Sequence, residues 1–320
     1  MTATPSANAR QNLHVRAGSS GDPTWDVMVT PESAGWGYSS LRVATLAPGQ
    51  EVSLETGDDE AVVVPLSGDV RVAVQGGDTY ELAGRASVFS GPADVLYLPQ
   101  GTTARISSEG AGRVAVTGAR VPEDAERLSP WVRRASDIPV ELRGAGTCTR
   151  EVHNFASADS PADYPAHKLI AVEVITPAGN WSSYPPHKHD ETSEQESELE
   201  EIYYYEISPG PHDEPGFGYH RTYGTPDRPL DVLAEVRSGD TVLVPHGWHG
   251  PCVAAPVHHM YYLNVMAGPE GNRAWRIVDD PDHGWVRSTW PDQQPDPRLP
   301  LIDEQTLSDE HSSDTTRETR

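Results

Sequence analysis

Cysteine is scarce in this chain of 320 residues, which contains only Cys148 and Cys252. Two cysteines cannot form the disulfide framework that stabilises many small secreted domains. Long apolar runs are also lacking: the chain has no stretch of about 18 apolar residues, the length of a membrane-spanning helix, and no apolar secretory signal near its start. These absences lead us to expect a soluble, cytoplasmic protein.

Basic residues are few compared with acidic ones. Lys and Arg together number 24 and Asp and Glu 48, which gives a formal net charge of −24 with neutral histidines. A chain this acidic repels phosphate backbones and anionic lipids. The charge therefore argues against nucleic acid or a membrane surface as the main partner and favours a small molecule.

Turn-forming residues are plentiful, with 28 Gly and 29 Pro. Between them lie short apolar runs, such as residues 62–74 and 93–106, whereas helical periodicity is weak. Short apolar runs separated by Gly, Pro and Asp are typical of strands. We predict an all-β protein.

The sequence repeats approximately once. Residues 62–74 correspond in order to 200–208, and residues 93–106 correspond to 240–253. At about 150 residues per domain, this indicates an internal duplication of a small closed β-barrel. We expect a flexible tail at 1–12, a first barrel at 13–150, a second barrel at 151–301 and a disordered tail at 302–320.

The candidate metal-ligating residues lie in the second half. The first two, His187 and His189, belong to the segment YPPHKHD. On a strand, residues two apart point to the same face, so both imidazoles can converge on one point. A second element, GDTVLVPHGWHGP, reads as a strand that ends in a Pro-x-Gly-x-His turn. This turn would let His249 reach back toward the pair.

A carboxylate can join these histidines from the segment LEEIYYYEIS. If Glu201 faces inward, Tyr203 and Tyr205 face inward too, and Glu200 and Glu206 face outward. The opposite phase would bury two carboxylates, so we favour Glu201. Three His and one Glu suit Zn²⁺, Mn²⁺ or Fe²⁺, and the sequence does not choose among them. Such a metal could polarise a carbonyl and hold an adjacent hydroxyl.

These residues resemble the cupin superfamily, whose first motif carries HxH and a later Glu and whose second carries PxG and a later His. The five segments WSSYPPHKHD, LEEIYYYEIS, GFGYHRTYG, GDTVLVPHGWH and YYLNVMAGP resemble more closely the 5-deoxy-glucuronate isomerases. These enzymes of inositol catabolism are related to the 4-deoxy-threo-hexulose-uronate isomerases. The resemblance extends over residues 11–301.

The resemblance implies a bicupin of two tandem double-stranded β-helix (jelly-roll) barrels. It implies a divalent metal in the second barrel, held by His187, His189, Glu201 and His249. The first barrel should bind no metal, because its corresponding segments contain no His. The implied reaction interconverts 5-deoxy-D-glucuronate and 5-dehydro-2-deoxy-D-gluconate, and the implied assembly is a homo-oligomer.

The base of such an aldose–ketose isomerisation could be Glu201, Glu200 or a water on the metal. Arg221, in the segment YHRTYG, is our candidate for the substrate carboxylate, because arginine binds carboxylates through two parallel hydrogen bonds. We expect Tyr203 and Tyr205 to line the pocket. Three alternatives stay open: a uronate isomerase with another substrate, an iron dioxygenase that consumes oxygen, and a bicupin that binds a sugar without turnover.

Overall fold

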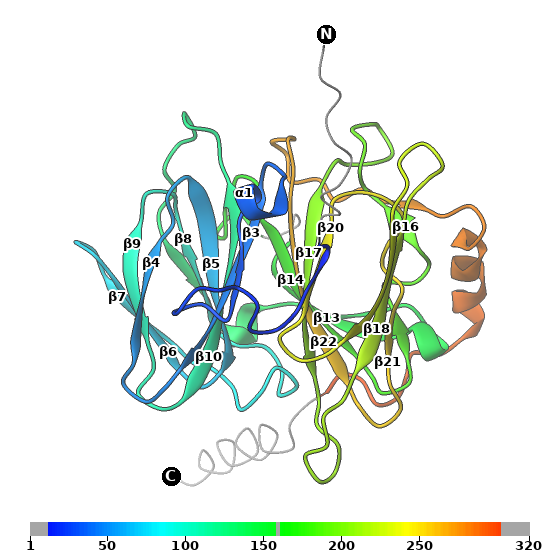
Figure 1. Ribbon diagram of the computed structural model, residues 1–320, viewed down its shortest axis with the longest axis horizontal. Helices are drawn as coiled ribbons and strands as arrows, with labels where there is room; N and C mark the ends of the chain where they lie inside the picture. The colour runs from blue at the N-terminus through cyan, green and yellow to red at the C-terminus, as the bar shows by residue number, and fades with distance from the viewer. Residues whose placement is uncertain (1–11, 158–160, 302–320) are drawn as a thin grey trace, which may run out of the picture.

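The computed structural model describes residues 12–157 and 161–301. Apart from Asn12, the two predicted tails lie outside the described residues. The described chain consists mainly of β-strands (Figure 1), which confirms the all-β prediction. Its helices are short: α1 (Pro31–Ala34), η1 (Ala135–Asp137), η2 (Gly146–Cys148) and η3 (Gly284–Asp292). No helix in the described ranges is long and apolar enough to cross a membrane.

The strands of the first half form two sheets. The larger has the order β11-β8-β5-β10-β3-β2, and the smaller has the order β4-β9-β6-β7. Alternate residues of β4 and β9 are buried, so one face of the smaller sheet packs on the larger sheet. The bounds are β2 (Val27–Val29), β3 (Ser39–Leu46), β4 (Glu51–Glu55), β5 (Asp59–Ser67), β6 (Val70–Val74), β7 (Thr79–Leu82), β8 (Val95–Leu98), β9 (Thr103–Ser107), β10 (Gly112–Arg120) and β11 (Trp131–Arg133).

The second half repeats this plan. Its larger sheet has the order β1-β20-β17-β22-β14-β13-β12, and a smaller sheet has the order β15-β21-β18-β19. The series β8-β5-β10-β3 of the first half matches β20-β17-β22-β14, as an internal duplication predicts. A further pair is β16-β23. The bounds are β1 (His14–Val15), β12 (Val140–Arg143), β13 (Arg150–Ala156), β14 (Ile170–Thr176), β15 (Trp181–Ser182), β16 (His187–Lys188), β17 (Glu200–Ile207), β18 (Gly218–Tyr223), β19 (Asp231–Val236), β20 (Thr241–Val244), β21 (Cys252–Ala254), β22 (Met260–Ala267) and β23 (Val278–Asp279).

The two larger sheets pack against each other, side by side in Figure 1. Val63 of β5 belongs to the core inside the first half, whereas its neighbours Val62 and Val64 pack with Tyr204 and Tyr261 of the second half. A strand buried on both faces needs a continuous apolar run, which explains the sequence AVVVPL at β5.

Both outer strands of the seven-stranded sheet precede the predicted boundary at residue 150. β1 pairs with β20 at one edge, and β12 pairs with β13 at the other. The Asp240 carboxylate fixes β1: it accepts hydrogen bonds from the Arg16 guanidinium and the Ala17 N–H, and lies 3.2 Å from His14 Nε2. The sheet of the second half is therefore completed by segments from the first.

A candidate metal centre and its cavity

The histidine pair and the turn histidine meet at the short strand β16. The backbones of His187 and His249 form an isolated antiparallel bridge, and Leu199 N–H bonds the carbonyl of His189. One nitrogen from each of His187, His189 and His249 lies within 4.8 Å of the others, and all three side chains are buried. The backbone therefore brings together histidines that are 62 positions apart at the extremes.

Gly247 gives the turn before His249 its shape. Its φ is +93°, and an added Cβ would lie 2.7 Å from the carbonyl oxygen of Tyr223. Only glycine tolerates both the positive φ and this close approach. The Pro-x-Gly-x-His pattern thus places His249 by a backbone requirement at its glycine.

Each imidazole is held from behind by a backbone carbonyl. The Nδ1 atoms of His187, His189 and His249 lie 3.1, 3.2 and 2.8 Å from the carbonyl oxygens of Pro185, Leu199 and Gly247, respectively. A carbonyl only accepts, so each Nδ1 carries the hydrogen and each neutral ring presents an Nε2 lone pair. Anchoring of this kind is what orients metal-binding histidines.

Glu201, on β17, completes the group. Its Oε2 lies 3.1 Å from His189 Nε2 and 2.9 Å from His249 Nε2, and these two nitrogens are themselves 3.1 Å apart. Two lone pairs and a carboxylate oxygen at such distances repel one another unless a cation lies among them. The donor set therefore fits a divalent metal.

The close packing of these groups shifts the pKa values of His187 and Glu201. Burial and the nearby His249 and His189 hold the pKa of His187 well below its usual range, so this ring stays neutral. Burial by itself would raise the pKa of Glu201, but the adjacent rings of His189 and His249 outweigh burial and hold the pKa below the ordinary value. A neutral imidazole beside an ionised carboxylate is the state that binds metal.

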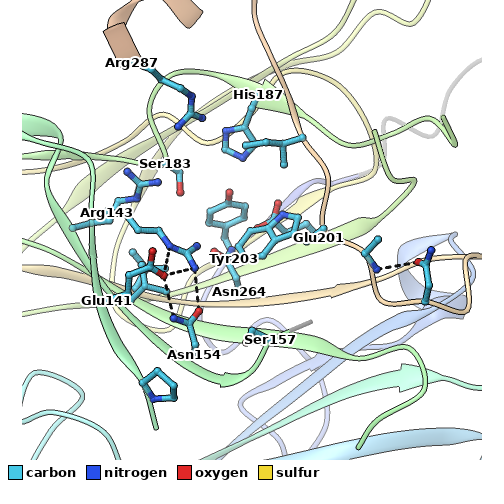
Figure 2. Close-up of a pocket in the computed structure, with 18 residues that line it drawn as sticks. Glu141, Arg143, Asn154, Ser157, Ser183, His187, Glu201, Tyr203, Asn264 and Arg287 are labelled. Atoms are coloured by element: carbon cyan, nitrogen blue, oxygen red, sulfur yellow. Dashed lines mark hydrogen bonds and ion pairs between the residues drawn. The ribbon is translucent and has the colours of Figure 1, made fainter. Parts of the chain in front are cut away.

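A cavity of about 800 Å³ opens beside this centre. Figure 2 shows His187, Glu201 and Tyr203 on one side of it and Glu141, Arg143 and Asn154 on another. Three arginines are among its lining residues, from three separate segments: Arg143, Arg150 and Arg287. Its remaining lining residues are Pro139, Val152, Ser157, Val174, Ser183, Asn264, Asn272, Ala274, Trp275 and Ile277. An anionic, hydroxyl-rich molecule would find many donors here.

The structure brings some of the predicted site residues to this cavity and places others elsewhere. Tyr203 lines it beside Glu201. Tyr205 is buried one alternation further along β17, where its hydroxyl lies 2.6 Å from His220 Nδ1 and 3.2 Å from Cys252 Sγ. Tyr205 is not among the lining residues.

Glu200 points the other way along β17, toward the first half. Its carboxylate accepts hydrogen bonds from the backbone N–H groups of Gly37, Tyr38 and Ser39, at 2.6, 2.8 and 2.9 Å. Arg221 pairs with Asp231 and donates to the Thr222 and Val232 carbonyls. Neither Glu200 nor Arg221 lines the cavity.

Sequence reasoning missed the three cavity arginines. Arg143 lies on β12, shortly before the predicted boundary between the halves, and Arg150 lies at that boundary, on β13. Arg287 lies in η3 and forms two hydrogen bonds with Asp279. The one available signal was the spacing of Arg143 and Arg150 around a Gly-rich turn, which is too common to identify a site.

Comparison with known proteins places this geometry in context. A family model described as the KduI/IolB family matches residues 13–286. A 5-deoxy-glucuronate isomerase of Geobacillus kaustophilus is 43% identical over 264 residues, which cover 81% of this chain and 90% of that protein. A 5-deoxy-glucuronate isomerase of Bacillus subtilis is 36% identical over 260 residues, which cover 81% of this chain and 91% of that protein.

Solved structures give a matching result. The crystal structure of an IolB-like protein from Salmonella typhimurium has a TM-score of 0.76 and 34% identity, and the match covers 86% of this chain and 99% of that chain. An oxalate decarboxylase from Lactobacillus farciminis, in complex with formate, has a TM-score of 0.58 and 12% identity, with 94% of each chain covered. The second likeness concerns the cupin fold alone.

Proposed function

The chain belongs to the KduI/IolB family, and from this membership we propose that it is an aldose–ketose isomerase that converts 5-deoxy-D-glucuronate to 5-dehydro-2-deoxy-D-gluconate in inositol catabolism. The observation that carries the proposal is the convergence of His187, His189, His249 and Glu201 beside an arginine-lined cavity, which His187 and Glu201 line. A sugar acid is a substrate that such a cavity suits, because it has both a carbonyl and a carboxylate.

We propose that the two halves are tandem cupin barrels, about residues 13–150 and 151–301. Strands β1 and β12 precede residue 150 but pair into the sheet of the second barrel. The repeated strand order and the cupin-fold likeness support this. The metal would lie only in the second barrel. A cytoplasmic location and a homo-oligomeric state stay predictions from the sequence.

We propose that His187, His189, His249 and Glu201 hold a divalent metal. When bound, the metal supplies a Lewis acid that polarises the substrate carbonyl. The carbonyls behind the three rings fix their tautomers, so the site needs no rearrangement to accept a cation. Zn²⁺, Mn²⁺ and Fe²⁺ all suit these donors.

The reaction moves one proton between neighbouring carbons. A base removes the proton from C2 and returns it to C1, while the C2 hydroxyl proton passes to the C1 oxygen; no oxidant or reductant is needed. We assign the carbon-to-carbon transfer to Glu201, because it lines the cavity and Glu200 does not. Oε2 approaches the two histidines, so Oε1 is the oxygen that exchanges the proton. Tyr203, whose pKa is raised well above its usual value by burial, stays neutral and lines the cavity beside Glu201.

Proton NMR of the metal-loaded protein with 5-deoxy-D-glucuronate in D₂O tests the proposal. We expect conversion to the ketose and deuterium at the migrating position, with His249→Ala inactive. No conversion by the metal-loaded protein would overturn the isomerase assignment, and oxygen uptake would point to a dioxygenase. Conversion without deuterium would overturn Glu201 as a base that exchanges with solvent while leaving the activity in place.

A further inference from the structure

One guanidinium of the cavity lacks a partner. Arg150 Nη1 is a buried atom with no hydrogen bond, and among the described residues the Arg150 side chain has neither a hydrogen bond nor an ion pair. Burial lowers the pKa of Arg150, and the nearby charges of Arg143 and Arg287 lower it further. The Arg150 side chain is half-buried, and a charge withdrawn from water without a partner is unfavourable, so its presence at a cavity wall calls for an anion.

The other two cavity arginines are already paired. Arg143 donates to the carboxylate of Glu141 and to the side-chain oxygen of Asn154, as Figure 2 shows. Arg287 forms its two hydrogen bonds with Asp279. A carboxylate thus neutralises each of these two side chains, so Arg150 is the arginine among the three whose charge is unpaired within the described residues.

Two further donors among the lining residues are also without partners. Asn264 Nδ2 and Trp275 Nε1 are buried and make no hydrogen bond within the described residues, and both residues line the cavity. Together with Arg150 Nη1 they form a set of three orphan atoms, all of which donate. Donors of this kind in a cavity lining are complementary to a ligand rich in hydrogen-bond acceptors, as a carboxylate is.

We infer that Arg150 binds the carboxylate of the substrate, with Asn264 and Trp275 as accompanying donors. This inference rests on the proposed function for the identity of the substrate. In 5-deoxy-D-glucuronate the carboxylate and the reacting carbonyl are at opposite ends of a six-carbon chain. The cavity can bind both ends, because its lining includes His187 and Glu201 of the proposed metal site for the carbonyl and the unpaired guanidinium of Arg150 for the carboxylate. Arg221, which is held by Asp231 outside the lining, does not serve this role.

A binding experiment tests this role independently of turnover. Isothermal titration of the metal-loaded protein would use D-glucuronate as the probe and D-glucose, its counterpart without a carboxylate, as the reference. We expect Arg150→Met to weaken D-glucuronate binding about 10- to 100-fold, the effect of losing hydrogen bonds to a charged group, and to leave D-glucose unchanged. Arg150→Lys should weaken D-glucuronate binding less than Arg150→Met, since lysine keeps the positive charge but cannot form two parallel hydrogen bonds with a carboxylate.

Controls separate this role from a structural one. Arg105→Met removes an exposed arginine of the first half and should change neither ligand's binding. Arg150→Met should melt no lower than the wild type, because it deletes an unpaired charge. Equal D-glucuronate binding by the wild type and Arg150→Met would overturn the inference, as would a loss confined to Arg221→Met.

Kinetics distinguish failure of the inference from failure of the proposed function. If the wild type isomerises 5-deoxy-D-glucuronate, Arg150→Met should raise KM by more than it lowers kcat, with bound metal unchanged. An unaltered KM would overturn the role of Arg150 and leave the activity standing. A wild type that binds D-glucuronate through Arg150 but turns over no 5-deoxy-D-glucuronate would refute the proposed function instead.

Discussion

A buried ion pair joins the two halves of the molecule, and its removal should weaken the whole fold. Arg85, between β7 and β8, reaches Glu173 on β14 with two guanidinium nitrogens. Glu173 also accepts a hydrogen bond from the Tyr261 hydroxyl at 2.8 Å and lies 3.1 Å from His153 Nδ1. The side chains of Arg85 and Glu173 are each only 2% exposed. We expect Arg85→Met to destabilise the protein strongly.

Two lines of reasoning give a similar magnitude. Removing one partner from a buried ion pair costs about 3–5 kcal/mol, because the other charge stays buried without compensation. For Glu173, burial would raise the pKa, but Arg85 and His153 bring it from the ordinary 4.5 down to about 2. That difference corresponds to about 3 kcal/mol of stabilisation.

The pH dependence has a definite sign. Because the pKa of Glu173 is lowered by folding, its contribution is complete above about pH 4.5 and is lost as the pH falls toward about 2. The pKa of His153 is raised, since its hydrogen bonds with Glu151 and Glu173 outweigh its burial. Its contribution is therefore present below about pH 6.5 and is lost at higher pH. The gap between wild type and Arg85→Met should be smaller at about pH 3 than at pH 7.

Urea unfolding followed by tryptophan fluorescence measures these differences. Arg71→Met is a matched control, because Arg71 and Glu81 form an ion pair with exposed side chains. It should cost less than about 1 kcal/mol at either pH. A loss for Arg85→Met no larger than that of the control would refute the buried-pair reasoning. An equal loss at both pH values would refute its assignment to the charge of Glu173.

Three other perturbations probe the candidate site. His187→Ala should abolish metal binding and lower turnover by more than about 100-fold, and metal analysis showing a full complement would contradict this. Gly250→Ala would place a Cβ 2.3 Å from the Ser183 carbonyl oxygen and 2.7 Å from His187 Cε1 at a φ of +108°. We expect it to lower both metal affinity and thermal stability, by about 1–3 kcal/mol for the latter; unchanged melting and metal content would refute the argument. Glu200→Gln should cost about 1–3 kcal/mol in unfolding experiments yet keep its metal, since it weakens three charged hydrogen bonds to the first half. A turnover loss as large as that of His187→Ala, in folded protein, would place Glu200 in the catalytic machinery.

The convergence of the candidate metal ligands could be predicted from sequence because its signals are local. His187 and His189 share a face by strand alternation, the same alternation orients Glu201, and a glycine two residues before His249 marks the turn. The repeated strand order could be anticipated for a similar reason, since both halves carry apolar runs between matching turns.

The arginine-lined part of the cavity could not be predicted in this way. Arg143, Arg150 and Arg287 come from three segments that only the tertiary fold brings together. Whether an arginine is free depends on what surrounds it: Asp279 neutralises Arg287, whereas Arg150 has no such neighbour within the described residues. Glu200 likewise follows the predicted alternation, yet it meets backbone N–H groups about 160 positions away instead of solvent. Sequence patterns show orientation within a strand but do not show what lies opposite.

Because β1 and β12 pair with strands of the second half, excision of that half alone has a structural consequence. A fragment that starts at Glu151 would lack both β1 and β12, so β20 and β13 would each present an unpaired row of backbone donors and acceptors. Open edges of this kind recruit strands from other molecules. Segments of the first half thus cover both edges of this sheet and protect it from pairing with other molecules. A minimal fragment that contains the candidate metal site would therefore need to include residues 13–17 and 140–143.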